Sequence, residues 1–150
     1  MKNIILVLVL ATGLVACQKN SYKNFEGTYD VKSSGSVNYF VGDSTFADEP
    51  GLVVIKQGEE KDELFLYVET NFVTSIAPLG VSATAKIDGN SYKMEQRNLN
   101  ISLDLGGTPV SLPFSVTASG VLSDDKNTLT SEIIFSGGIT GVMTSVGTKK

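Results

Sequence analysis

Histidine and tryptophan are absent from this chain, and cysteine occurs once in its 150 residues. Without histidine the chain cannot carry a Ser-His-Asp triad, a Cys-His nucleophile pair or an imidazole ligand to zinc. Without tryptophan it lacks the strongest stacking surface for sugars and cationic ligands, although five tyrosines could substitute in part. The single cysteine, Cys17, has no partner for an internal disulfide. From these absences we expect no enzyme activity, no metal and no cofactor.

Basic residues are also few, and no run of them exists. The chain has 12 Lys and Arg against 16 Asp and Glu, for a net charge of −4. If Lys2 is removed with a leader, 11 basic residues remain and the net charge becomes −5. Nucleic-acid binding requires a basic stripe that displaces counterions, so we expect no nucleic-acid partner.

The first seventeen residues have the form of a lipoprotein leader. One positive charge, Lys2, precedes an apolar run over residues 4–16, which is shorter than the roughly 20 residues of a membrane-spanning helix. The run ends in Leu14-Val15-Ala16-Cys17, which resembles the lipobox of bacterial lipoproteins. We expect residues 1–16 to be a signal peptide and acyl chains on Cys17 to hold the protein to a membrane. The alternative is an ordinary secretory signal whose cysteine is accidental.

The residues after Cys17 bear on localisation. Gln18 is not the aspartate associated with retention in the inner membrane, so the sorting rule favours the outer membrane of the cell envelope. No acidic residue lies between Cys17 and Glu26, so the acidic patches that accompany surface export are missing. We therefore prefer attachment facing the periplasm over the cell surface.

The mature chain would be 134 residues long, which suits one domain. Residues 17–24 are polar and unpatterned after the cysteine, as in a flexible tether, and residues 25–150 are expected to form a single β domain. Short runs of β-branched and aromatic residues alternate there with polar ones, separated by Gly, Asn and Asp clusters. The pattern predicts about ten strands, over residues 27–32, 36–41, 51–57, 63–70, 81–87, 91–96, 98–105, 110–118, 128–136 and 139–148.

Three local signals refine this prediction. Asp88-Gly89 is typical of a hairpin with a type I′ turn, which needs positive φ at both central positions. Pro113 within a strand predicts a broken ladder or an edge. Residues 71–80 are the exception, because their apolar spacing fits a short helical turn as well as a continued strand.

An antiparallel meander of hairpins removes both exposed edges only by closing on itself, so we predict an all-β fold with about 8–10 strands closed into a barrel. The one-sided apolar pattern also fits a two-sheet β-sandwich, which stays open as the alternative. The opening Phe25-Glu26-Gly27-Thr28-Tyr29 and the closing stretches 118–122 and 129–137 resemble the calycin-like, or lipocalin-like, lipoproteins of Gram-negative bacteria. Lipocalins proper carry Trp near this glycine, where the chain has Thr28 and Tyr29, so the looser calycin-like group is the better match.

The barrel lumen is the main candidate site, because barrels of this size either fill themselves or hold one small ligand. The predicted lining is Tyr92, Met94, Ile101, Leu103, Leu112, Phe114, Ile133 and Phe135. The alternative is that these residues form a solid core, since apolar alternating faces are what any β core needs.

Two acidic runs are interpreted as turns. Residues 59–63 carry four carboxylates without the spacing of a calcium loop and fit a solvated hairpin tip. Residues 124–127 favour a turn for local hydrogen-bonding reasons. No pair of carboxylates can be nominated for acid–base catalysis.

Our leading hypothesis is a lipid-anchored protein that binds a small apolar or amphipathic ligand in the barrel lumen. The alternative is an interaction or inhibitor module that has a solid core and docks another envelope protein.

Overall fold

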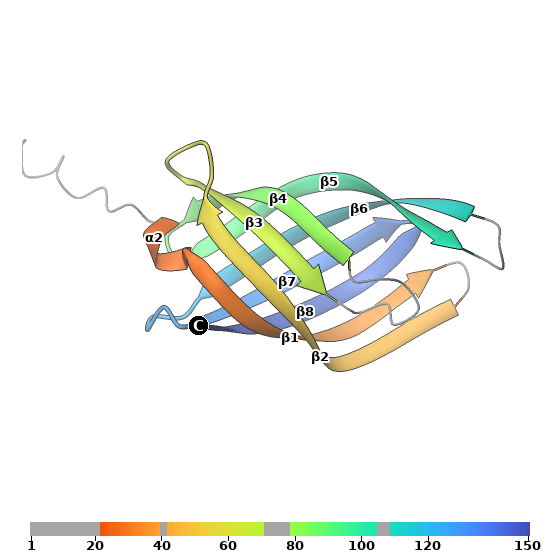
Figure 1. Ribbon diagram of the computed structural model, residues 1–150, viewed down its shortest axis with the longest axis horizontal. Coiled ribbons are helices and arrows are strands. Elements are labelled where there is room, and N and C mark those ends of the chain that lie inside the picture. The colour runs from red at the N-terminus through yellow and green to blue at the C-terminus, as the bar shows by residue number, and fades with distance from the viewer. Residues whose placement is uncertain (1–21, 40–41, 71–78, 105–108) are drawn as a thin grey trace, which may run out of the picture.

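The computed structural model describes residues 22–39, 42–70, 79–104 and 109–150. Eight antiparallel strands follow one another in chain order around a closed barrel, and the last strand pairs with the first (Figure 1). The elements are a single helical turn, α2 (Tyr22–Phe25), followed by β1 (Gly27–Tyr39), β2 (Gly42–Gln57), β3 (Glu63–Thr70), β4 (Leu79–Asp88), β5 (Ser91–Asp104), β6 (Pro109–Leu122), β7 (Thr128–Gly137) and β8 (Ile139–Lys149). The predicted antiparallel barrel is confirmed, and the alternative two-sheet sandwich is not formed.

The first two predicted strands are one strand, β1, because Ser33-Ser34-Gly35 does not form the expected break. Ser33 is buried, and its hydroxyl pairs with that of Ser145 on β8 at 2.7 Å. Gly35 lies against the backbone of β8, where an added Cβ would meet the carbonyl oxygen of Val142 at 2.3 Å. Both residues contribute to the contact between β1 and β8. Small residues that are typical of turns therefore occur here because the two strands pack closely.

The predicted strands at 91–96 and 98–105 are likewise one strand, β5, which carries a β-bulge. Its register with β6 shifts between Met94, opposite Ala118, and Arg97, opposite Val116. The extra residue changes the parity of the inward face, so that Met94 and Leu99 both face the interior. In the sequence pattern this change of parity has the form of a boundary between two strands, and two strands were therefore predicted.

A second bulge explains why β2 begins earlier than the predicted residue 51. Ser33 and Gly35 of β1 pair with Glu49 and Phe46, so β2 has one extra residue there. Asp48 takes a positive φ of 55°, and its backbone N–H donates to the Ser34 hydroxyl at 3.0 Å. The inward parity switches here as well, which hid residues 42–50 from a search for regular alternation.

The hairpin predicted at Asp88-Gly89 is present, displaced by one residue. Asp88 pairs with Ser91, so Gly89 and Asn90 are the central residues of the turn. Of these only Gly89 has a positive φ, 61°, which is the pattern of a type II′ turn rather than the predicted I′.

Pro113 does not break the ladder between β5 and β6. Their register runs without interruption from Arg97 opposite Val116 past Asn100 opposite Pro113. The ladder to β7 does end here, because its last pair is Phe114 with Gly137, and Gly138 N–H donates to the Pro113 carbonyl at 2.9 Å. The prediction was thus wrong for one neighbouring strand and right for the other. The ambiguous segment at 71–80 lies mostly outside the described residues.

One end of the barrel is closed by packing. The element α2 lies at the same end as the β2–β3, β4–β5 and β6–β7 turns and the C-terminus (Figure 1). Phe25 is fully buried there, with its ring edge-on to Tyr92 at a centroid distance of 6.2 Å. The fully buried large side chains gather mainly near these turns, namely Phe25, Tyr29, Ile55, Leu64, Leu122 and Leu129. We call this packed end the barrel floor.

Candidate functional site

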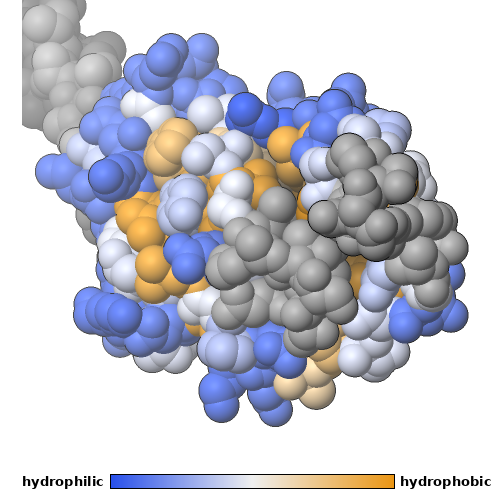
Figure 2. All heavy atoms as spheres, turned by 45° about the vertical axis from the view of Figure 1, so that its right-hand side comes forward, coloured by the Kyte–Doolittle hydropathy of each residue, from blue (hydrophilic) through white to orange (hydrophobic). Residues whose placement is uncertain are grey.

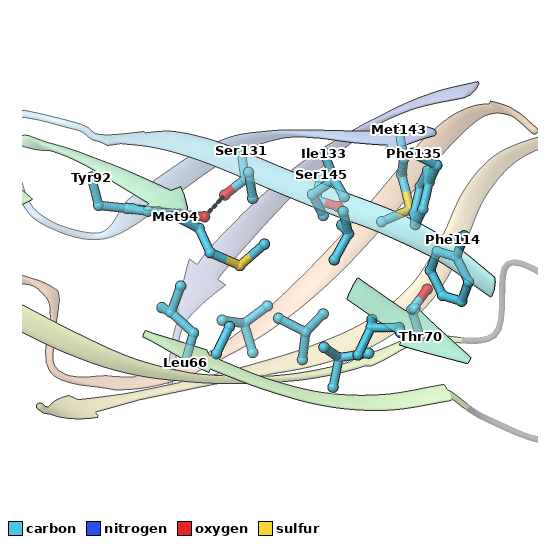
Figure 3. Close-up of a pocket in the computed structure, with 17 residues that line it drawn as sticks. Leu66, Thr70, Tyr92, Met94, Phe114, Ser131, Ile133, Phe135, Met143 and Ser145 are labelled. Atoms are coloured by element: carbon cyan, nitrogen blue, oxygen red, sulfur yellow. Dashed lines mark hydrogen bonds between the residues drawn. The ribbon is translucent and has the colours of Figure 1, made fainter. Parts of the chain in front are cut away.

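The lumen between the floor and the opposite end holds a cavity of about 60 Å³ (Figure 3). Drug-sized ligand pockets are several times larger. The cavity is therefore neither a solid core nor a wide ligand pocket, and it suits something slender.

Five of the eight predicted lining residues border this cavity: Tyr92, Met94, Phe114, Ile133 and Phe135. Figure 3 shows Tyr92 at one end of the cavity and Phe114 at the other. The rings of Phe114 and Phe135 lie 6.3 Å apart and tilted by 46°. The structure thus brings this part of the predicted set together, and ligand binding by it stays a prediction.

The other three predicted residues do not border the cavity. Ile101 is buried in the core and Leu112 is half-buried against it, so both serve packing beyond the cavity. The side chain of Leu103 lies outside the described residues, although its backbone pairs with Val110. Ile101 and Leu103 follow the β5 bulge, and Leu112 pairs with Ile101, so all three lie toward the end away from the floor.

Sequence reasoning missed the wall that β3 and β4 contribute. Leu66, Val68, Val81 and Ala83 all line the cavity, together with Val53 of β2 and Met143 of β8. The alternation of Leu64, Leu66 and Val68 was present, but Phe65 on the outer face of β3 is also apolar and 39% exposed. With apolar residues on both faces of a strand, periodicity alone does not identify the inner one.

Polar groups facing the lumen are few. The Tyr92 hydroxyl donates to Ser131 Oγ at 2.8 Å (Figure 3), and Ser33 pairs with Ser145. Burial raises the pKa of Tyr92, an effect that the hydrogen bond with Ser131 opposes. Thr70 is 5% exposed, borders the cavity, and its Oγ1 has no hydrogen-bond partner. None of the described cavity-lining residues is charged.

The wall of the barrel is incomplete between β4 and β5. Their described register has four pairs, ending at Ala85 opposite Met94, although β4 begins at Leu79 and β5 continues to Asp104. We call the stretch beyond Ala85 and Met94 the β4–β5 seam. Val81 and Leu99, the cavity-lining residues on its two sides, are half-buried, whereas Ala83 and Met94 are buried. The cavity therefore approaches solvent along the seam.

Figure 2 brings the end opposite the floor toward the viewer. Hydrophobic atoms are visible on this face inside a rim of hydrophilic ones.

The acidic run at 59–63 forms an exposed hairpin tip. Glu63 Oε2 accepts from the backbone N–H of Glu59 at 3.0 Å, and Lys86 forms an ion pair with Glu60. The hydrogen bond from Lys86 to Glu60 raises the pKa of this lysine. Glu63 thus stabilises the turn, and Glu60 and Asp62 join the turn to β4 through Lys86. No cluster of three or more potential metal ligands is found within the described ranges.

The run at 124–127 is also a turn, as predicted. Asp125 accepts hydrogen bonds from the Ser123 hydroxyl and from the backbone N–H of Asn127, which lower the pKa of its carboxyl. Lys126 takes a positive φ of 62°. Local turn chemistry therefore accounts for this run.

A scan against protein-family models found no matching family, and a search of curated proteins found no matching sequence. The eight-stranded antiparallel barrel is compatible with the calycin-like fold that the sequence resembles. In the described part of the chain, no helix is both long and apolar enough to span a membrane.

Proposed function

We propose that this protein is a lipid-anchored binding protein of the cell envelope that holds a slender apolar or amphipathic ligand in its lumen. The observation that carries the proposal is the apolar cavity that borders the β4–β5 seam. A core built only for stability gains from closing such a space, because a cavity forfeits packing contacts. An unfilled apolar space next to a gap in the wall is what a ligand site requires.

Binding can be tested by displacement of a neutral fluorescent dye with one unbranched chain, such as the linear polyene 2,4,6,8-decatetraen-1-ol, from the protein without its leader. Ala83 is buried and lines the cavity, so Ala83→Leu fills part of the space and should weaken binding at least fivefold. Thr84→Leu is the matched control, since Thr84 is exposed on the outer side of the same strand. Dye binding that is absent, or equal in the two variants, would contradict the proposal.

The anchor is tested separately. Cys17 lies outside the described residues, five positions before Tyr22, which begins α2 beside the barrel floor. Acylation of Cys17 would therefore attach the molecule at its closed end and leave the seam free. Mass spectrometry of the mature protein should show a diacyl or triacyl cysteine at its N-terminus. Cys17→Ser should move the protein from the membrane fraction to the soluble fraction.

Placement in the outer membrane, facing the periplasm, is part of the same proposal. It rests on Gln18 after the cysteine and on the lack of acidic residues before Glu26. Separation of the two membranes by density should recover the protein with the outer one, and protease added to intact cells should leave it uncut. Gln18→Asp should shift it to the inner membrane.

One observation favours a second candidate, a module that docks another envelope protein. Four aliphatic side chains on the outer face of β6 to β8, Val121, Ile134, Val142 and Val146, are 44–57% exposed. A photoreactive residue at the exposed position 144, between two of them, should then crosslink one defined partner in intact envelopes. The same residue at exposed position 82 on β4 is the control. Equal crosslinking from both positions would contradict this candidate.

A further inference from the structure

Thr70 is the described residue whose buried polar atom lacks a partner. It ends β3, where it pairs with Gly51 of β2 and Leu79 of β4, and its side chain is 95% buried. Figure 3 shows its hydroxyl at the Phe114 end of the cavity, far from Tyr92. The other buried hydroxyls have partners: Ser33 pairs with Ser145, Tyr92 with Ser131, and Tyr29 with the Phe25 carbonyl. An unpaired buried hydroxyl is costly, and a ligand atom that pairs with it removes the cost.

The lining also limits the charge of a ligand. Since none of the described cavity-lining residues is charged, a buried carboxylate or ammonium would have no counter-ion. A polar group that meets Thr70 must therefore be neutral, such as a hydroxyl, an ester carbonyl or an amide. All of these form a hydrogen bond with a threonine hydroxyl.

The shape of the cavity limits the body of the ligand. The space extends between the Thr70 and Phe114 end and the Tyr92 end, and its volume is about 60 Å³ (Figure 3). A sterol or another fused-ring compound is too bulky for so small a space, whereas an unbranched alkyl chain has the smallest cross-section of the common apolar groups. Apart from the paired hydroxyls, the side chains along this path are apolar.

Resting on the proposed function, we propose that the lumen binds an uncharged amphiphile with one unbranched chain. The polar end of this ligand forms a hydrogen bond with Thr70 Oγ1, as acceptor or as donor. The chain of the ligand extends toward Tyr92. Thr70 is thus a specificity-determining residue that selects a neutral polar end.

The test compares hexanol, hexanoate and hexane as competitors of the neutral dye at pH 8, with the wild-type protein and Thr70→Val. Hexanol should bind the wild type at least tenfold more tightly than hexanoate. Thr70→Val keeps the shape of the side chain and removes the hydroxyl. In this variant the affinity for hexanol should fall about five- to tenfold, and the affinity for hexane should stay unchanged. Thr130→Val, on the exposed outer face of β7, should change neither affinity.

The outcomes separate the two proposals. If the dye and all three competitors fail to bind the wild type, the lumenal binding function itself is wrong. If they bind but Thr70→Val leaves hexanol unaffected, or hexanoate binds as well as hexanol, only the inference about Thr70 is overturned. Thr70→Val should also unfold at a higher temperature than the wild type, because it removes an unpaired buried hydroxyl, so loss of folding does not confuse the comparison.

Discussion

Individual polar side chains inside this barrel are distinguished by whether they have a partner. Tyr29 is fully buried, and its hydroxyl donates to the carbonyl of Phe25 at 2.7 Å, which ties β1 to the last residue of α2. The ammonium of Lys149 lies 5.7 Å from the centre of the Tyr29 ring. Inward serines such as Ser131 were not predictable from periodicity, because a serine at an inward position gives the same signal as an irregular strand. Their pairing partners are distant in the sequence.

Tyr29 should make stability depend on pH in the alkaline range. Burial raises its pKa from 10.0 to about 12. The folded state therefore holds the proton more tightly than the unfolded state. The free energy of unfolding should be constant with respect to this group below about pH 10 and fall as the pH rises toward 12.

Urea unfolding at pH 9 and pH 11 measures this effect. Tyr29→Phe should lower the free energy of unfolding at pH 9 by about 1 kcal/mol, since the Phe25 carbonyl loses its donor, and should show a smaller further loss at pH 11. Tyr92 keeps part of the alkaline sensitivity in this variant, because burial raises the pKa of that group too. An equal alkaline loss with and without the Tyr29 hydroxyl would contradict the assignment.

At the level of elements, the sequence predicted strand structure at the position of every observed strand, but it did not predict all of the strand limits. Regular alternation was sufficient for β3, β7 and β8, whose predicted ranges differ from the observed ones by one residue or less at each end. It failed at the bulges of β2 and β5, because a bulge exchanges inward and outward parity within one strand. Only five of the 17 described residues that line the cavity were predicted, and those of β3 were missed because β3 carries apolar residues on both faces.

Gly35 should be essential to the contact between β1 and β8. Gly35→Ala places a Cβ 2.3 Å from the carbonyl oxygen of Val142, a backbone atom that cannot move aside alone. We expect the free energy of unfolding to fall by about 1–3 kcal/mol. Ser36→Ala, at the next and exposed position, should change it by less than about 0.5 kcal/mol. Chemical denaturation of both variants is the measurement, and equal stability of the two would show that the strands are less closely packed than described.

The β4–β5 seam should appear in amide hydrogen exchange. Beyond Ala85 and Met94 the two strands have no described pairing, so amides in residues 80–84 that point toward β5 have no ladder partner. Every second amide in this stretch should exchange much faster than the amides of β1 and β8, which pair over eleven positions. Exchange followed by NMR gives residue-level rates. Uniform protection along β4 would mean that the seam is closed in solution.

Considered as a whole, the molecule is a barrel with one packed end, the barrel floor, and a small interior cavity. Closure depends on β1 pairing with β8, the described strands most distant in sequence, and this pairing was expected from the need to remove strand edges. The volume of the interior was not predictable, because it depends on how side chains from different strands interdigitate. Alternation identifies which residues face inward, but it does not determine the space that remains between them.

The small interior predicts a limit on ligand length. Each added methylene that enters the lumen should tighten binding about fourfold, given roughly 0.8 kcal/mol per buried CH₂. Because the cavity is several times smaller than a drug-sized pocket, the gain should stop at a short chain length in a series of straight-chain alcohols. Dye displacement across the series measures this limit. A steady gain through much longer alcohols would show that they bind outside the lumen or that the walls separate to admit them.

The floor formed by Phe25 and its neighbours has a kinetic consequence. In a channel that is open at both ends, an incoming molecule can displace a bound one through the opposite opening. A cavity that is closed at one end does not allow this. A molecule held here must leave before its successor can enter, so the exchange rate should reach a plateau set by residence time, however concentrated the competitor. Delivery to an acceptor would then require contact on the seam side of the barrel, where the occupant departs.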